Sequence, residues 1–508
     1  MKENKFIMGA FYIALGGFIA KAIGAIYRVP LTNVIGSYGM GLYQLVFPLY
    51  SLLLTVSGTG VPSALSKLIA EKISLNDRVN ADGIFKTSLA LMSVIGLFLS
   101  ISLLAFAPLV ARVQGDKNAT LLYMLISPSV FLVSIMSVFR GYFQGRMNMK
   151  PTALSQIIEQ IVKLLFGLFF AYYFMPNVLK ATAGAVLSVT LSEVVGTVYL
   201  LFVFIKRRDV KDKIKGERLS VKSRVKIITL QILPITLSGL LLPISQLIDS
   251  FLVVNLIKRY AENSTALYGM YSGGVNSIIN MPVALCYGFS ATILPLMSAH
   301  LIKGENALAR EKQNTAIELT FLLAFICSAL CFIFSKSIAN LLFYNLSTSE
   351  INLISRLLKI SSFSILFLSL MQTTSAILVA KNLGRKSMRN LFFGCVVKVL
   401  LNLILLSNEN IGIYGASISG ISCYFVAGTL NLLYIIKEKQ SRERLIGYFV
   451  KVSLVSVFSA EIGFIFTVLM QGILGFVVGG AVAVLLFGLQ VLTLKLVTLK
   501  PTYSRRKV

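Results

Sequence analysis

Residues 86–111 read KTSLALMSVIGLFLSISLLAFAPLVA and carry no charged side chain after Lys86. A helix that crosses the hydrocarbon core of a bilayer needs about 20 mostly apolar residues, so this stretch is long enough to span a membrane. Similar apolar stretches occur along the whole chain. The others are 6–27, 38–62, 121–142, 155–175, 182–205, 226–256, 267–298, 315–335, 353–380, 391–407, 412–436, 446–471 and 473–496. The sequence therefore predicts an all-α polytopic membrane protein with about 14 transmembrane helices.

Composition supports a membrane protein. The chain has 508 residues, of which 56% are hydrophobic and only 13% are charged. Soluble globular proteins carry about 25% charged residues, so a soluble protein of this composition would lack the polar side chains to cover its surface. The formal net charge is +28, which in a soluble protein would suggest nucleic-acid binding. Here the cations lie in short segments between apolar stretches, so we expect no nucleic-acid partner.

Lysine and arginine are concentrated in every second connection between the predicted spans. The segment from Lys206 to Lys226 alone contains ten of them. Because cationic connections stay on the cytoplasmic side, this alternation predicts an even number of spans with both termini cytoplasmic. The first apolar stretch contains Lys21 and lacks a small-residue cleavage site, so we expect a retained helix rather than a signal peptide.

The two halves of the chain resemble each other weakly. Leu15-Gly16-Gly17 matches Leu237-Ser238-Gly239, and Asn33 matches Asn255 at the same offset. This repeat predicts two six-helix lobes related by pseudo-two-fold symmetry, with a substrate site between them and alternating access as the transport mode. The predicted domains are an N-terminal six-helix lobe (1–205), a basic cytoplasmic linker (206–225), a C-terminal six-helix lobe (226–440) and a segment with two additional transmembrane helices and a basic tail (441–508).

Charged residues inside the spans are the candidate site residues, because placing a charge at the bilayer centre costs about 2.5–3.5 kcal/mol on insertion scales. Lys21 and Arg28 lie in or just after the first span, on one helix face and roughly 10 Å apart along its axis. With no acid within a helical turn, this pair predicts a binding site for an anionic substrate. The alternative is that Arg28 extends to the outer interface while Lys21 pairs with an acid on another helix.

Glu159, Lys163 and Asp249 are the other candidate substrate-binding residues. Glu159 and Lys163 have the favourable Glu-to-Lys spacing in one helix, so they either neutralise each other or contribute to the site. Asp249 lies mid-span, where it would either bind a coupling cation, H⁺ or Na⁺, or pair with a cation of the first span. Further charges inside spans are Glu193, Glu318, Arg356, Lys359, Lys398 and Glu461.

The chain lacks the sequence motifs that several kinds of activity require. No G-x-x-x-x-G-K-[ST] motif is present, so we expect no ATP hydrolysis. The five cysteines lie within apolar stretches and His300 is the only histidine, so we expect no metal site. We therefore predict that the protein is not an enzyme and uses no cofactor. The spacing Gly475-x-x-x-Gly479 predicts close packing of the last helix.

Two stretches resemble a known family. Residues 21–71 read KAIGAIYRVPLTNVIGSYGMGLYQLVFPLYSLLLTVSGTGVPSALSKLIAE, and residues 140–163 read RGYFQGRMNMKPTALSQIIEQIVK. Both resemble the polysaccharide-flippase branch of the MOP exporter superfamily, and within it the group of stage V sporulation protein B and the MurJ-like lipid II flippases. The resemblance implies a V-shaped pair of lobes around a cationic cavity, with a groove for a lipid tail along the last two helices.

The resemblance also implies a function in a bacterial cytoplasmic membrane. The expected function is a flippase that moves an undecaprenyl-diphosphate-linked saccharide, either lipid II or a related polysaccharide precursor, from the inner to the outer leaflet. Its product would serve the cell wall, the spore cortex or a surface polysaccharide. The expected partners are this lipid-linked oligosaccharide, membrane lipids and a coupling ion, and we expect a monomer.

The chain departs from the family pattern at two places. Lys21 falls on a basic position of the lipid II flippases, but the next basic position falls on Tyr27, with Arg28 one place later, and a third finds only leucines around Leu53. The alternative function is a cation-coupled multidrug exporter of the related branch, which would have acids in its central cavity. A membrane scaffold without transport activity would leave the charges inside the spans unexplained.

Overall fold

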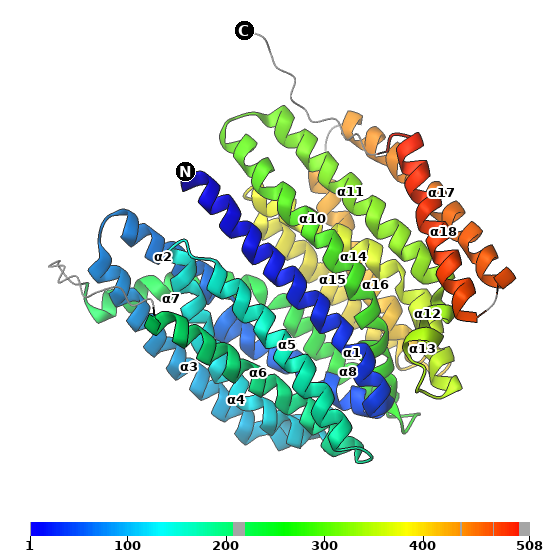
Figure 1. The fold of residues 1–508 in the computed structure, drawn as a ribbon, viewed down its shortest axis with the longest axis horizontal. Helices are drawn as coiled ribbons and strands as arrows, with labels where there is room; N and C mark the ends of the chain where they lie inside the picture. The colour runs from blue at the N-terminus through cyan, green and yellow to red at the C-terminus, as the bar shows by residue number, and fades with distance from the viewer. Residues whose placement is uncertain (1, 207–218, 437–438, 471, 497–508) are drawn as a thin grey trace, which may run out of the picture.

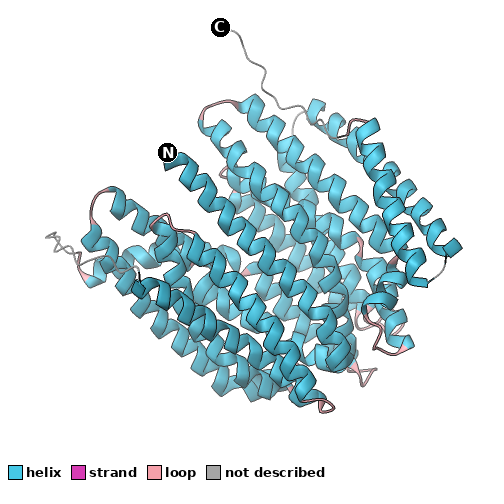
Figure 2. Ribbon diagram, viewed as in Figure 1, coloured by secondary structure: helices cyan, strands magenta, loops and turns pink. Residues whose placement is uncertain are grey.

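The computed structural model describes residues 2–206, 219–436, 439–470 and 472–496, and within these ranges it contains helices but no strand (Figure 2). The first half contains α1 (Lys2–Leu54), a π-helical turn (Thr55–Thr59), α2 (Val61–Ser74), α3 (Arg78–Val113), α4 (Ala119–Gly145), α5 (Lys150–Tyr173) and α6 (Val178–Lys206). The second half contains α7 (Val221–Gly239), α8 (Leu241–Ile257), α9 (Ser264–Tyr268), a second π-helical turn (Gly269–Val275), α10 (Asn276–Ile302), α11 (Asn306–Ile333), α12 (Ser335–Leu342), α13 (Thr348–Ser361), α14 (Phe363–Ala380), α15 (Gly384–Leu405) and α16 (Tyr414–Ile435). Two further helices follow, α17 (Lys439–Met470) and α18 (Gly472–Thr493).

The long helix α1 is broken at Gly36. A straight helix of this length would measure about 80 Å, far more than the thickness of a bilayer. Gly36 has φ 70° and ψ −179°, a backbone conformation that is nearly restricted to glycine. Figure 1 shows the chain turning back at this point, at the end of the molecule away from the start of α1. The two arms of α1 correspond to the predicted spans 6–27 and 38–62.

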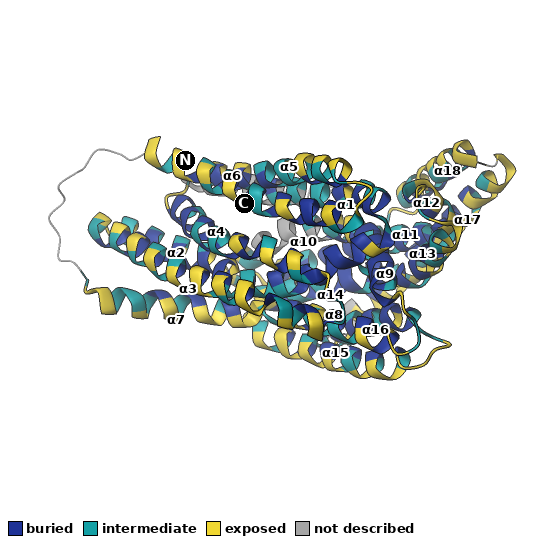
Figure 3. Cartoon of the chain, turned by 90° about the horizontal axis from the view of Figure 1, so that it is seen from below, coloured by how far each residue is buried: buried dark blue, intermediate teal, exposed yellow. Residues whose placement is uncertain are grey.

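The all-α polytopic architecture is confirmed. Eleven helices of the described residues are long and apolar enough to cross a membrane, or twelve if α7 and α8 form one bent span. The first of them runs from Ala22 to Ser74 and contains the break at Gly36. Many large apolar residues are exposed, as a lipid-facing surface requires, and Figure 3 shows exposed residues along the outer faces of the helices. The number 14 and the pseudo-two-fold symmetry stay predictions.

The helix predicted to begin the second lobe contacts both halves of the molecule. Ile228 and Ile232 of α7 belong to the same buried apolar cluster as Leu65 of α2 and Phe139 of α4. The axis then bends by 43° between α7 and α8, and α8 packs on α1 and α15. Residues 221–239 therefore pack on the first half, and the predicted domain bounds stay predictions. Residues 207–218 of the predicted linker lie outside the described residues.

The last two helices pack closely on each other, as the glycine spacing predicts. A Cβ atom on Gly479 would overlap the Thr467 side chain and the carbonyl oxygen of Gly463, both in α17. The pair is also attached to the second lobe, because Arg444 of α17 binds both carboxylate oxygens of Glu318 in α11 at 2.9 and 3.1 Å. Residues 497–508, the predicted basic tail, lie outside the described residues.

Candidate functional site

Hydrogen bonds between the two halves gather at one end of the molecule. Ser37 of α1 donates a hydrogen bond to Glu350 of α13, and Thr265 of α9 donates one to Asp116, between α3 and α4, at 2.9 Å. The backbones also touch here, since a Cβ atom on Gly41 would overlap the backbone of Thr265. We call this region, residues 33–41, 113–118, 255–271 and 342–350, the closed end. Figure 1 places it at the lower right, opposite the start of α1.

Two asparagines contribute matching contacts to the closed end. Asn33 donates its side-chain N–H to the carbonyl oxygen of Leu342 at 2.7 Å, and Asn255 donates to that of Val113 at 2.8 Å. Each therefore reaches from its own half to a helix end in the other half. Each also donates to the carbonyl four residues earlier in its own helix. These are the two asparagines that the sequence repeat pairs with each other.

Arg28 and Lys163 form a pair of cations near the junction of the halves. Lys163 of α5 lies 6.0 Å from the centroid of the Tyr27 ring and interacts electrostatically with Arg28. Arg28 in turn lies near Tyr268 of α9, which belongs to the second half. In the part of the chain that the structure describes, neither cation forms an ion pair with a carboxylate. Two cations that interact with each other and form no direct ion pair with a carboxylate among the described residues favour binding of an anion, while Glu159 and Glu193 act on Lys163 from further away.

Glu159 does not pair with Lys163. Its carboxylate forms an ion pair with Arg140 of α4, and Arg140 Nε also donates to Ser155 Oγ at 3.0 Å. The proposal that Glu159 and Lys163 neutralise each other is therefore not what the structure contains. Glu159 pairs with a cation of the neighbouring helix despite the favourable spacing within α5, because it lies on the buried face of α5 that contacts α4. This pairing leaves Lys163 without a direct ion pair among the described residues.

A second acid, Glu193 of α6, lies close to this group and was not among the predicted site residues. Its carboxylate interacts with the hydroxyl of Tyr50, but among the described residues neither the buried Oε2 atom nor that hydroxyl has a partner within hydrogen-bond distance. Glu193 interacts electrostatically with Glu159 and Lys163. A buried carboxylate oxygen without a partner is costly. In the sequence, Glu193 is recognisable only as a charge inside a span. Its environment could not be predicted, because the neighbours of Glu193 belong to three other helices.

Asp249 belongs to a closed network in the second half. Its carboxylate forms an ion pair with Lys398 of α15 and accepts a hydrogen bond from Asn402 at 2.8 Å. Ser419 of α16 donates to Asn402 in turn. Among the described side chains, Asp249 therefore pairs with Lys398 and not with Arg28, and no pattern in the sequence connects Asp249 with Lys398. The Lys21 side chain lies outside the described part of the structure, although its backbone is part of α1.

The comparison with family models decides the membership of the chain. The model for the polysaccharide biosynthesis protein family matches residues 6–301, more than half of the sequence. The chain belongs to this family. A second model, MatE, matches residues 234–404. The expected place in the MOP exporter superfamily is confirmed, and the chain is a multi-pass membrane protein.

Two relatives from Bacillus subtilis (strain 168) are similar along most of their length. Stage V sporulation protein B is 27% identical over 427 residues, which cover 82% of this chain and 81% of the relative. Lipid II flippase MurJ is 26% identical over 428 residues, covering 80% and 78%.

Solved structures share the fold. Lipid II flippase MurJ in an inward closed conformation has a TM-score of 0.71 at 15% identity, with 95% of this chain and 99% of that chain covered. An inward-facing multidrug resistance MATE family transporter has a TM-score of 0.71 at 18% identity, covering 87% and 98%. Both branches of the superfamily are therefore equally close in overall fold, and the choice between their functions depends on the site.

Proposed function

We propose that the protein is a flippase that moves an undecaprenyl-diphosphate-linked saccharide from the inner to the outer leaflet by alternating access. The observation that carries this proposal is the pair of cations, Arg28 and Lys163, at the junction of the halves. A diphosphate brings negative charges that arginine and lysine bind well. The family membership and the similarity to lipid II flippase MurJ of Bacillus subtilis support the same substrate class.

The physical need for such a site follows from the cost of crossing a bilayer. Moving a diphosphate and its sugars through hydrocarbon would remove water from charged and polar groups, at several kcal/mol for each unpaired group. A cationic site between two lobes offsets this cost while the polyprenyl chain stays in lipid. The closed end supports alternating access. It joins the lobes on the side of the membrane that the charge pattern assigns to the exterior of the cell, as expected for the state that is closed to the exterior.

The multidrug exporter remains the second candidate, since the MatE model matches residues 234–404. It needs an accessible acid to bind a cationic substrate or a coupling ion. Asp249, the acid on which this alternative depended, is already neutralised by Lys398. Glu193 is the acid that still favours it, because its Oε2 atom has no partner among the described residues.

Binding measurements distinguish the two candidates. Purified protein would be titrated with undecaprenyl diphosphate and, separately, with uncharged undecaprenol, using native mass spectrometry to determine the dissociation constants. Arg28→Gln and Lys163→Gln should each weaken diphosphate binding by about tenfold or more, since a hydrogen bond to a charged group contributes about 1.5–3 kcal/mol. Lys180→Gln, which removes an exposed cation outside the site, is the matched control. Equal affinity for both lipids in all variants would contradict the proposal.

A further inference from the structure

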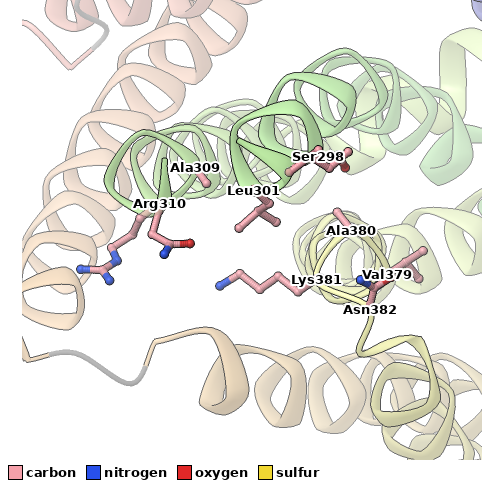
Figure 4. A pocket seen from close by; sticks show the side chains of 10 residues that line it. Ser298, Leu301, Ala309, Arg310, Val379, Ala380, Lys381 and Asn382 are labelled. Atoms are coloured by element: carbon pink, nitrogen blue, oxygen red, sulfur yellow. The ribbon is translucent and has the colours of Figure 1, made fainter. Parts of the chain in front are cut away.

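A cavity of about 850 Å³ lies between the end of α10, the beginning of α11 and the end of α14 (Figure 4). Arg310 and Lys381 are the two cations of its lining, and each already has an interaction partner. Their charges therefore indicate no further ligand. Buried polar atoms that have no hydrogen-bond partner among the described residues lie elsewhere, and two of them belong to α5, the helix that carries Lys163.

Polar side chains follow one face of α5. Gln156, Gln160 and Lys163 succeed one another at spacings of four and three residues, so their side chains lie one above the other on the helix. The Oε1 atom of Gln156 is buried and has no hydrogen-bond partner among the described residues, and the same holds for the hydroxyl of Thr152 one turn earlier. A buried polar atom without a partner is costly, so this face of α5 favours a ligand that supplies hydrogen bonds.

Two glycines of α1 lie opposite this face. A Cβ atom on Gly24 would lie 3.1 Å from Gln160 Oε1 and 4.0 Å from Lys163 Nζ. The amide of Gln160 and the ammonium group of Lys163 are therefore neighbours. A Cβ atom on Gly17 would lie 4.0 Å from Gln156 Oε1. The two amides thus continue the polar face of α5 from the cation that we propose to bind the diphosphate.

The closed end determines the direction in which a bound substrate can extend from the cations. On the outer side the two halves are in contact, down to their backbones. The glutamines lie on the opposite side, because they face Gly17 and Gly24, which precede Arg28 in α1 and are further from the break at Gly36. A group that is attached to the bound diphosphate therefore extends toward the cytoplasmic side, along the two amides.

We propose that Gln156 and Gln160 bind the saccharide of the transported lipid, next to the diphosphate at Arg28 and Lys163; this inference rests on the proposed function. A saccharide presents neutral hydroxyl groups close together, and a glutamine amide supplies both donors and an acceptor for them. The first sugar is bonded directly to the diphosphate, so the groups that bind it must lie beside the cations, as Gln160 does. The amides thereby make the site prefer a lipid that carries a saccharide over the bare polyprenyl diphosphate.

Native mass spectrometry of the full chain tests this site with two lipids. One is undecaprenyl diphosphate, and the other is undecaprenyl diphosphate that carries one N-acetylglucosamine. Gln156→Leu and Gln160→Leu should each weaken binding of the glycosylated lipid by about fivefold, the effect of one neutral hydrogen bond, and leave the affinity for the bare lipid within about twofold. Gln144→Leu removes an amide near the end of α4, in the same half, and should change neither affinity. Thermal unfolding without added lipid verifies that each variant is folded.

A loss of affinity that is confined to the glycosylated lipid would support the proposal, and two outcomes would overturn it. An equal loss for both lipids would mean that the amides act on the diphosphate or on the packing of α1 and α5. Unchanged affinity for both lipids in both variants would mean that the saccharide binds elsewhere. Failure of the proposed function gives a different result and overturns both, because the wild type would then bind undecaprenyl diphosphate no more tightly than undecaprenol.

Discussion

At the scale of single residues, the role of a charged side chain depends on whether it has an ion-pair partner. Asp249 has Lys398 and Asn402, and Glu159 has Arg140, so these acids are satisfied within their own halves. Arg28 and Lys163 have no carboxylate partner among the described residues and lie where the halves meet. The first group therefore holds helices together, and we propose that the second group binds the ligand.

The structural role of Asp249 leads to a prediction about stability. Lys398→Met leaves a buried carboxylate without its cation and should reduce the free energy of unfolding by about 3–5 kcal/mol. Adding Asp249→Asn to Lys398→Met should recover most of this loss, because the buried charge is then gone. Thermal unfolding in detergent measures both changes, and Arg356→Met, the loss of an exposed cation, is the control.

The alternative role of Asp249 predicts a different result. If this carboxylate binds a coupling cation, Na⁺ should raise the unfolding temperature of the wild type, and Asp249→Asn should abolish that increase. Under our account Na⁺ has no such effect, since Lys398 already occupies the carboxylate.

At the scale of helices, adjacent glycines of α18 have opposite surroundings. Gly479 touches α17, whereas a Cβ atom on Gly480 would meet nothing within 4 Å. Gly479→Ala should separate the two helices and cost about 1–3 kcal/mol of stability. Gly480→Ala is the matched control and should leave the packing unchanged. Hydrogen exchange of residues 459–490 measures the effect, and equal protection in both variants would refute the close-packing account.

The two asparagines of the closed end allow a test of how the halves separate. Asn33→Ala and Asn255→Ala each remove a hydrogen bond between the halves, so each should increase the fraction of molecules in which this end is open. Lys117 and Tyr344 would each be replaced by a cysteine that carries a spin label, in a variant without other cysteines. Double electron–electron resonance then measures the distance between the two labels across the closed end. Asn410→Ala, at an outer connection within the second half, should leave the distance distribution unchanged. Unaltered distributions in the Asn33 and Asn255 variants would show that these bonds do not hold the end closed.

At the scale of the whole molecule, hydropathy predicts the helices well because the bilayer imposes one length and one composition on every span. Each predicted span overlaps a helix of the structure. Gly36, where α1 is broken, lies between the predicted spans 6–27 and 38–62, although this residue is not among those singled out from the sequence. The bend between α7 and α8 and the packing of α7 on the first half were not predicted, because they depend on which helices are neighbours.

The candidate site was predicted only in part. Arg28 and Lys163 were selected because a charge inside a span is rare, but their proximity across α1 and α5 has no signature in the sequence. Local spacing suggested Glu159 and Lys163 as partners, whereas the structure pairs Glu159 with Arg140 of another helix. Asp249 and Lys398 are 149 residues apart in the chain, and no periodicity connects them.

We propose that the protein transports an anionic lipid-linked saccharide through a site that contains Arg28 and Lys163. The most direct measurement uses liposomes with a fluorescent undecaprenyl-diphosphate sugar and follows the protection of the label from an external quencher. The account predicts fast transfer by the wild type and by Lys180→Gln, and transfer slowed by about tenfold or more in Arg28→Gln and Lys163→Gln. No transfer by the wild type under any ion gradient or membrane potential, together with gradient-driven efflux of a cationic dye, would contradict it.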